Sequence, residues 1–491
     1  MPTTIQPPRE VRPVPTDIND WNNTAMVTIA SFLGMVPEVG SLLNGLVYIL
    51  WPSDQQDVWD QIKDQVQQLI DQDLTELVKG LENQTLEGLK NDIGDYEDAI
   101  ATQDSSNIST NWRSANQNFG LSIPQFQVAD YEVALLPYFA QAVNLHLALL
   151  RDGVLHGKDW GWTDADVFSA KQQLVDAIDQ YNQYVGDTFN QENQKRFDAF
   201  SNAERDYLVF CANNPPMDYS LGIHYNVTAW NAYNNFVQYM TLHVLDFWKM
   251  WPSFSGGPVT VVLDREIYSA ACGSSDYAVI PGTPWSSMPT QPISQIEVFA
   301  GDRIDGILLT YPAGGGPNGQ TQVVAGKITD PGDTHTTFAT AVNPLVGVSV
   351  WFGDVVGALQ CDSSDGTFTN VGRDIPSSKN TWYLPAPPGE IISSVYINGT
   401  DQSYQSANLI IFGYQYQRKT TADLTALRHL YVVSPSEIDL SQLAARCVTK
   451  PVSIDALTKA AKREGWDAQR QQYRNTVKRR RTAAKPPRRA S

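Results

Sequence analysis

Apolar residues recur at helical spacing through much of the first half of the chain. From Asp54 to Ile100 they fall three or four residues apart, with acids and amides between them, at Val58, Ile62, Val66, Leu69, Ile70, Leu74 and Leu77. That spacing places them on one face of an α-helix. The same pattern predicts a long helix that begins at Thr163 or Asp164, and another from Trp230 to Trp251 that Pro252 ends.

Two stretches are apolar enough to raise the question of a membrane. The first, from Ala25 to Trp51, carries one formal charge, Glu38, and is long enough to span a bilayer, which takes about 20 apolar residues. However, Gly34, Pro37 and Gly40 interrupt it, and no Lys or Arg cluster flanks it. We therefore favour two short buried helices over a membrane span.

The second stretch has no Asp, Glu, Lys or Arg between Val133 and Leu150, and its apolar residues lie on every side of the helix. Such a helix must be buried by other helices or by lipid, and about 20 residues measure about 30 Å, the thickness of the hydrocarbon core. It can therefore serve in water or in a membrane. The residues that we assign to it are Val133, Leu135, Leu136, Phe139, Val143, Leu145, His146, Leu147, Leu149 and Leu150.

His146 allows two interpretations. It could sense pH or face a pore, or it could be a hydrogen-bonded core histidine, which we favour. Before it in the chain, the pattern predicts an amide-rich helix from Asn107 to Leu121, which ends at Gly120 and Pro124.

The residue pattern changes after Gly256 and Gly257, where β-branched and aromatic residues alternate with polar ones in short runs. A weak repeat recurs with glycines at 301, 353 and 399, about 50 residues apart, a period that fits one sheet per copy. We expect a multi-domain fold with an N-terminal helical bundle around a central hydrophobic helix, then an all-β prism of three sheets. The expected divisions are a flexible segment 1–24, a bundle 25–257, a prism 258–417, and a helical and basic extension 418–491.

Charge is distributed unevenly along the chain. Of 35 Lys+Arg and 53 Asp+Glu, residues 418–491 hold 17 and 6, a balance of +11, so the net −18 leaves −29 for the rest. Such an acidic body repels polyanions, so no nucleic acid partner is expected. The basic cluster Lys478 to Arg481 could still bind anionic lipid or nucleic acid, although a solvated or proteolytically removed tail is favoured.

No catalytic, metal or cofactor site is indicated. The four cysteines are scattered without a C-x-x-C pair, and no paired-carboxylate or triad motif is visible. Gly314 to Thr321 mimics a phosphate loop, but Gln320 stands where a lysine is needed. We predict that the protein is not an enzyme. The N-terminus also lacks the apolar segment of a secretory signal, so we expect a cytoplasmic or inclusion protein that acts outside the cell.

Two blocks carry a family resemblance. Residues 131–162, with Ala140-Gln141-Ala142, Asn144-Leu145-His146-Leu147 and Trp160-Gly161, resemble the central helix of the Cry-type delta-endotoxins, which are insecticidal crystal toxins. Residues 230–252 resemble the family's last bundle helix, and 264–269 its entry into the second domain. The β half resembles the family's prism, and its Gly301 to Gly306 also resembles a strand of jacalin-type lectins. Residues 418–491 do not read as the family's third domain, a β-sandwich, so we expect a member that lacks it.

This resemblance implies a pore-forming insecticidal toxin. The prism would bind a protein or glycan receptor on gut epithelial cells, host proteases would trim the ends, and several copies would associate as a helical hairpin enters the membrane. The pore-lining candidates are Asn107, Asn111 and Asn116. The alternatives are a carbohydrate-binding defence lectin with a helical assembly domain and, more remotely, an intracellular scaffold.

Recognition residues are expected in the loops of the prism, because aromatic side chains offer a large contact area at low entropic cost. The candidates are Tyr311, Asn318, Arg373, Ser377, Trp382 and Tyr404. Gly301 and Asp305 have the spacing with which lectin prisms hold sugar hydroxyls, although we favour a plain strand-turn role for them.

Overall fold

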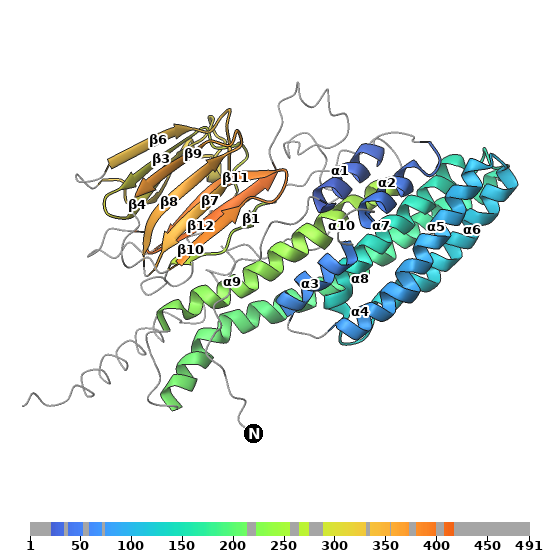
Figure 1. Cartoon of the computed structure of the whole chain (residues 1–491), viewed down its shortest axis with the longest axis horizontal. Helices are drawn as coiled ribbons and strands as arrows, with labels where there is room; N and C mark the ends of the chain where they lie inside the picture. Colours follow the sequence, from blue (N-terminus) through green and yellow to red (C-terminus); the bar gives the residue numbers. More distant parts are fainter. Residues whose placement is uncertain are drawn as a thin grey trace, which may run out of the picture.

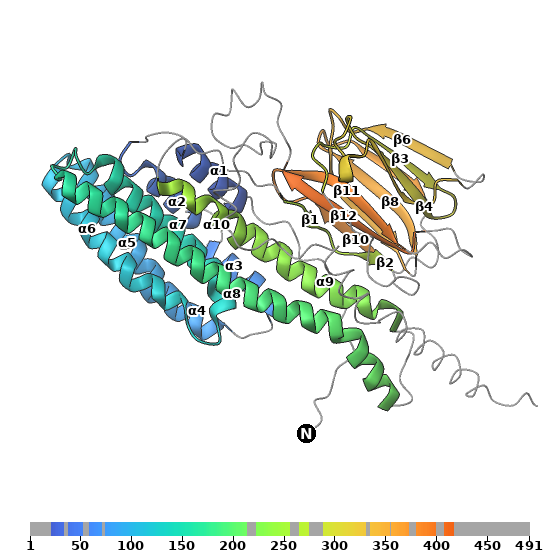
Figure 2. The same ribbon diagram turned by 180° about the vertical axis from the view of Figure 1, so that it is seen from behind.

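The computed structural model pairs a bundle of helices with a smaller β unit packed against one side of it (Figure 1). It describes residues 21–33, 38–52, 58–70, 74–213, 222–255, 265–273, 288–329, 334–353, 355–372, 380–398 and 407–416. The view from behind shows the same two units, with α9 running along the β unit (Figure 2). A helical bundle followed by three sheets confirms the expected fold class. The extension 418–491 lies outside the described residues.

The bundle contains ten α-helices in the part of the chain that the structure describes. They are α1 Trp21–Leu33, α2 Ser41–Leu50, α3 Val58–Ile70, α4 Thr75–Leu81, α5 Glu87–Ala101, α6 Ser105–Ser122, α7 Glu132–His156, α8 Asp164–Asn213, α9 Gly222–Met240 and α10 Asp246–Met250. Short 3₁₀ or π turns continue some of them: η1 Glu82–Leu86, η2 Ile123–Phe126, η4 Thr241–Leu245 and η5 Trp251–Ser255.

The first apolar stretch forms two helices rather than one span. Gly40 adopts a left-handed φ of 76° immediately before α2, a conformation that glycine adopts without strain. One boundary needs correcting, because α1 already begins at Trp21, inside the segment 1–24 that was expected to be flexible. Trp21 is buried and continues the helical spacing of Ala25 and Ile29, so it belongs to the bundle core.

The amide-rich helix α6 has a clear start and a clear buried face. The carboxylate of Asp104 accepts hydrogen bonds from the N–H groups of Ser106 and Asn107, which caps the helix. Its buried residues follow the helical period: Ile108, Trp112, Ala115 and Phe119. The amides lie mainly on the other faces, as the sequence pattern predicts.

The β unit consists of three four-stranded antiparallel sheets in the described residues. Their orders are β10-β7-β8-β9, β5-β4-β3-β6, and β1-β12-β11 with β2 also paired to β12. The strands are β1 Ile267–Tyr268, β2 Cys272–Gly273, β3 Gln295–Ala300, β4 Ile304–Thr310, β5 Gln322–Gly326, β6 Thr334–Ala339, β7 Leu345–Phe352, β8 Val356–Ser363, β9 Phe368–Gly372, β10 Asn380–Pro385, β11 Glu390–Asn398 and β12 Leu409–Tyr416.

Each copy of the sequence repeat corresponds to one strand in a different sheet. Its three copies fall on β3, β7 and β11, and Gly301 and Gly353 occupy the hairpins that follow β3 and β7. Position 399 lies outside the described residues. One apolar core joins the three sheets, with Val298, Val350 and Val395 among its members. The period of about 50 residues therefore marks one sheet per copy, as predicted.

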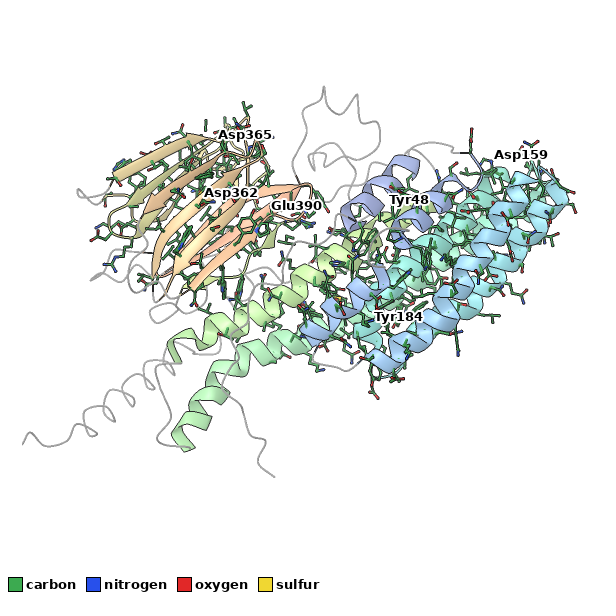
Figure 3. The ribbon with its side chains drawn as sticks, in the orientation of Figure 1. Tyr48, Asp159, Tyr184, Asp362, Asp365 and Glu390 are labelled. Atoms are coloured by element: carbon green, nitrogen blue, oxygen red, sulfur yellow. The ribbon has the colours of Figure 1, made fainter. Side chains whose placement is uncertain are left out.

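Polar contacts fix the β unit to the bundle through α9 and α10. The Asn231 side chain accepts from the Ala271 N–H at 2.7 Å and donates to the Ala271 carbonyl at 3.1 Å. The buried guanidinium of Arg265 reaches both Asp246 on α10 and Glu390 on β11, each at 2.7 Å. Glu390 lies on the side of the β unit that faces the bundle (Figure 3). These buried hydrogen bonds specify one arrangement of the two units.

Candidate functional site

Helix α7 is the central helix of the bundle. All of the assigned residues except Val133 are buried in it, and Val133 is half-buried and packs against the same core. In the described residues, α7 is the one helix long and apolar enough to cross a membrane by length and composition, and it is almost wholly enclosed by protein. A buried core helix of a water-soluble protein satisfies the same test, so length and composition leave both roles open.

The polar side chains within α7 each find a partner on another helix or turn. Asn144 accepts from the indole N–H of Trp251 at 2.8 Å and donates to Gln141 at 3.0 Å. Gln141 in turn donates to the carbonyl of His243 at 3.3 Å. Because buried amides are costly without hydrogen bonds, these contacts allow Gln141 and Asn144 to lie within an otherwise apolar stretch of the helix.

His146 forms a hydrogen-bond chain that crosses three helices. Its Nδ1 lies 2.7 Å from the Tyr181 hydroxyl on α8, and its Nε2 lies 2.9 Å from Asn116 Oδ1 on α6. Asn116 donates its own amide to Gln173 at 3.0 Å, so its oxygen must accept from His146. Nε2 therefore carries a proton, and in the neutral imidazole the Tyr181 hydroxyl donates to Nδ1.

Burial lowers the pKa of His146 to about 3, which fits this neutral state. A cavity of about 290 Å³ opens beside the ring between α6 and α8, lined mostly by amides and small apolar groups that include Gln127, Gln173 and Gln180. The structure thus shows the hydrogen-bonded core histidine that the sequence favoured. A pore-facing role after insertion stays a prediction.

Asp152, near the end of α7, is a buried carboxylate that sequence reasoning missed. It accepts from the Gly40 N–H at 2.9 Å and from the Tyr96 hydroxyl at 3.3 Å, which ties α7 to the start of α2 and to α5. Burial raises its pKa to about 7, against the opposing effects of these hydrogen bonds and of neighbouring Arg151. A charged pair at the end of an apolar run was the only sequence signal.

The three pore-lining candidates lie on α6 but not on a single exposed stripe. Asn107 is exposed, and Asn111 donates to its carbonyl and to its side chain, both at 3.0 Å. Asn116 instead faces α8 and is half-buried by its contacts with Gln173 and His146. Their pore-lining role stays a prediction.

Two of the recognition candidates on the β unit need correcting. Tyr311 is 1% exposed, and its hydroxyl donates to the Ser393 carbonyl at 2.8 Å, so it is a core residue. Trp382 lies within strand β10, and its ring packs edge-on against Phe352 on the core side. Its neighbour Tyr383 points to the outer face and is 53% exposed. The alternation of strand side chains decided which aromatic ring faces solvent.

The remaining recognition candidates divide in two groups. Asn318 is exposed in the turn between β4 and β5 and has a left-handed φ of 57°, so it stays a candidate. Arg373, Ser377 and Tyr404 lie outside the described residues. Gly301 and Asp305 contact each other, because the Gly301 N–H donates to the Asp305 carboxylate at 3.4 Å and Asp305 is buried. That contact favours the strand-turn role over a sugar site.

The described residues contain no group of His, Cys, Asp and Glu side chains that could hold a metal ion. Cys272 and Cys361 are buried free thiols, and burial raises the pKa of each, so neither is poised as a nucleophile.

Comparison with known proteins identifies the bundle. Residues 27–255 match the family model of the delta endotoxin N-terminal domain. The chain is 28% identical over 253 residues to the pesticidal crystal protein Cry1Ja of Bacillus thuringiensis, covering 49% of this chain and 20% of that protein. It is 33% identical over 185 residues to Cry7Aa of the same organism, covering 34% and 16%. The matched part therefore spans a fifth or less of these two relatives.

Solved structures extend the likeness to the fold of both units. Insecticidal delta-endotoxin Cry8Ea1 from Bacillus thuringiensis superposes with a TM-score of 0.60 at 20% identity, covering 81% of this chain and 73% of that one. PirB superposes with a TM-score of 0.61 at 19% identity, covering 80% and 94%. At these identities the likeness establishes the arrangement of helices and sheets.

Proposed function

The chain belongs to the Cry-type delta-endotoxin family, with the N-terminal domain of that family at residues 27–255, and from this premise we propose that it is a pore-forming insecticidal toxin. The observation that carries the proposal is α7, an apolar helix of 25 residues at the centre of the bundle. At about 1.5 Å per residue it exceeds the thickness of a bilayer core. The protein that surrounds α7 in water can then be exchanged for lipid.

The inserting unit we propose is the hairpin of α6 and α7. The two helices are joined by η2 and a short turn, so they can leave the bundle together. Lipid would cover the apolar faces of α7, while the amides of α6 and the polar groups of Gln141, Asn144 and His146 would face water or one another. Several copies would be required to enclose a water-filled pore.

The β unit is proposed to bind the receptor on target gut epithelial cells. This proposal is supported by the single apolar core that joins the three sheets. Because the core holds the strands in place, the loops between them can vary in sequence without disturbing the fold. Asn318 is the described candidate, and Arg373, Ser377 and Tyr404 are proposed with it. We extend the proposal, by analogy with the family, to synthesis as an inclusion, activation by host proteases and action at the plasma membrane.

Dye release from receptor-free liposomes tests the pore directly. Leu149→Asp places a charge in the segment that enters the bilayer, where it costs about 2.5 to 3.5 kcal/mol on insertion scales. The matched control is Leu174→Asp on α8, because both leucines are 0% exposed and both changes damage the soluble bundle. We expect both variants to lose stability and only Leu149→Asp to abolish leakage by the protein that remains folded.

Each result has a clear consequence. A folded Leu149→Asp variant that releases dye at the wild-type rate would remove α7 from the mechanism. Absence of leakage from the wild-type chain, before and after limited proteolysis, would count against the pore and favour the lectin alternative.

A further inference from the structure

The outer face of the sheet β10-β7-β8-β9 exposes aromatic rings at one end. Tyr383 on β10 is 53% exposed and Phe368 on β9 is 62% exposed, whereas their neighbours Leu384 and Val371 point into the core. Val342, in the loop that leads into β7, is 87% exposed. The side chain of Asn343 in this loop donates to Asp365 in the β8–β9 turn at 2.6 Å, so loop and turn form one surface.

The two exposed rings approach Asp362 from different rows of the sheet, because Tyr383 is opposite Ser349 whereas Phe368 is opposite Asp362. The hydroxyl end of Tyr383 reaches diagonally to Gly347 on β7, since its hydroxyl and the nearest ring atoms come within 2.7 to 3.1 Å of where a Cβ at Gly347 would sit. Asp362 on β8 is opposite Gly347, and Phe368 on β9 is opposite Asp362. Residues directly opposite in antiparallel strands point to the same face about 5 Å apart. Asp362 therefore lies between Phe368 on one side and, on the other, the position at Gly347 that the hydroxyl end of Tyr383 reaches.

This part of the sheet face carries negative charge. Gln360 donates to Asp362 Oδ1 at 3.0 Å, which orients the carboxylate. Asp365 lies at the same end of the sheet (Figure 3), and hydrogen bonds from the Thr367 hydroxyl and N–H hold its pKa below the usual range. Residues 334–353, 355–372 and 380–398, which form this region as described, contain no Lys or Arg.

We propose that this face binds the choline headgroup of phospholipids in the target membrane. A quaternary ammonium has no N–H donor and is weakly hydrated, so ring faces and a nearby carboxylate hold it better than hydrogen bonds would. The charge of Asp362 and Asp365 complements the trimethylammonium group. The apolar tip at Val342 suits the boundary between headgroups and acyl chains, which a strongly hydrated lysine of a protein partner would not use.

This inference deepens the proposed function, because it names a first contact between the β unit and the membrane. The test of the headgroup site measures vesicle binding alone, independently of dye release. Protein that binds choline vesicles but releases no dye would count against the pore and leave the headgroup site in place. Dye release without any headgroup preference in binding would support the pore and count against the headgroup site.

The test is co-sedimentation of the full-length protein with vesicles of palmitoyl-oleoyl phosphatidylcholine. In a second set, phosphatidylethanolamine replaces two thirds of that lipid, which removes methyl groups without changing the net charge. We expect binding to the second set to fall by about three- to tenfold, and choline chloride to compete where the same concentration of sodium chloride does not. These two measurements need no variant, so they do not depend on how a mutant folds.

Variants locate the site. Asp362→Asn, Phe368→Thr and Tyr383→Thr should each weaken binding to phosphatidylcholine vesicles by about three- to tenfold. The controls are Glu76→Gln, an exposed carboxylate on α4, and Val324→Thr, an exposed strand residue on β5, which should bind like the wild type. Equal binding to both vesicle sets, or no effect of choline, overturns the proposal. Variants that bind vesicles normally but lose binding to protease-sensitive sites on target cells would show that the face reads a protein instead.

Discussion

Arg265 and Glu390 form a bidentate ion pair where the two units meet, with Nη1 at 2.8 Å from Oε2 and Nη2 at 2.7 Å from Oε1. Nη2 also donates to Asp246 on α10 at 2.7 Å, so one guanidinium holds a carboxylate from each unit. Burial opposes the charge on Arg265, but the two carboxylates outweigh it and raise the pKa of Arg265 well above its usual range. The contact therefore depends on a permanent positive charge.

We expect Arg265→Met to destabilise the protein by about 3 to 5 kcal/mol, because it leaves Asp246 and Glu390 buried without a counter-charge. Lys195→Met is the control, since Lys195 pairs with Glu192 at 3.2 Å but is largely exposed, and such pairs contribute about 1 kcal/mol or less. Urea unfolding measures both. Similar midpoints for the two variants would mean that the buried pair adds no more than a surface pair.

His146 should make the bundle less stable in acid. Its folded pKa of about 3 lies below the ordinary value near 6.5, so the unfolded chain binds more protons between these values. Stability from this group is therefore present above about pH 6.5 and falls as the pH drops toward 3, by about 1.4 kcal/mol per unit at most. In His146→Gln, the free energy of unfolding should change less between pH 7 and pH 4 than in the wild type. An identical pH profile would contradict the neutral, buried imidazole.

Asp152 should act in the opposite direction. Its folded pKa of about 7 lies above the ordinary value near 4, so the folded protein holds a proton that the unfolded chain has released. The stability it contributes is full below about pH 4 and is lost as the pH rises to 7. Asp152→Asn keeps an acceptor for the Gly40 N–H and has no charge to bury, so it should be more stable than the wild type above pH 7. Thermal melts at pH 5 and pH 8 compare the two proteins, and a greater advantage at pH 5 would contradict this assignment.

Gly153 should resist substitution although it lies within a helix. An alanine Cβ there would sit 2.5 Å from the ring of Trp112, and that ring is held by a 2.7 Å hydrogen bond from its N–H to the Leu149 carbonyl. We expect Gly153→Ala to cost about 1 to 3 kcal/mol through overpacking between α6 and α7. Gly94→Ala on α5 is the control, because a Cβ there would meet nothing within 4 Å. This substitution should stabilise the folded protein by about 0.5 to 1 kcal/mol. Circular dichroism during urea unfolding compares them, and equal shifts in the same direction would contradict the packing argument.

Sequence alone determined the helices, the three-fold β repeat and the unusual character of α7. These features depend on local periodicity: apolar residues at three- or four-residue spacing in α6, apolar residues on every side of α7, and recurring glycines near the hairpins of the sheets. The resemblance in residues 131–162 added the family. None of this required knowledge of which segments meet in space.

Only the tertiary structure decided which side chains meet and which face water. His146 finds its partners on α6 and α8, and Asp152 finds its partner at Gly40, 112 residues away, so no local pattern could pair them. Tyr311 and Tyr383 are both tyrosines in the β unit, yet Tyr311 is buried in the core whereas Tyr383 is exposed and reaches toward Gly347. The physical reason is that burial and hydrogen bonding depend on what the rest of the chain brings to a position, whereas period and propensity depend only on its neighbours.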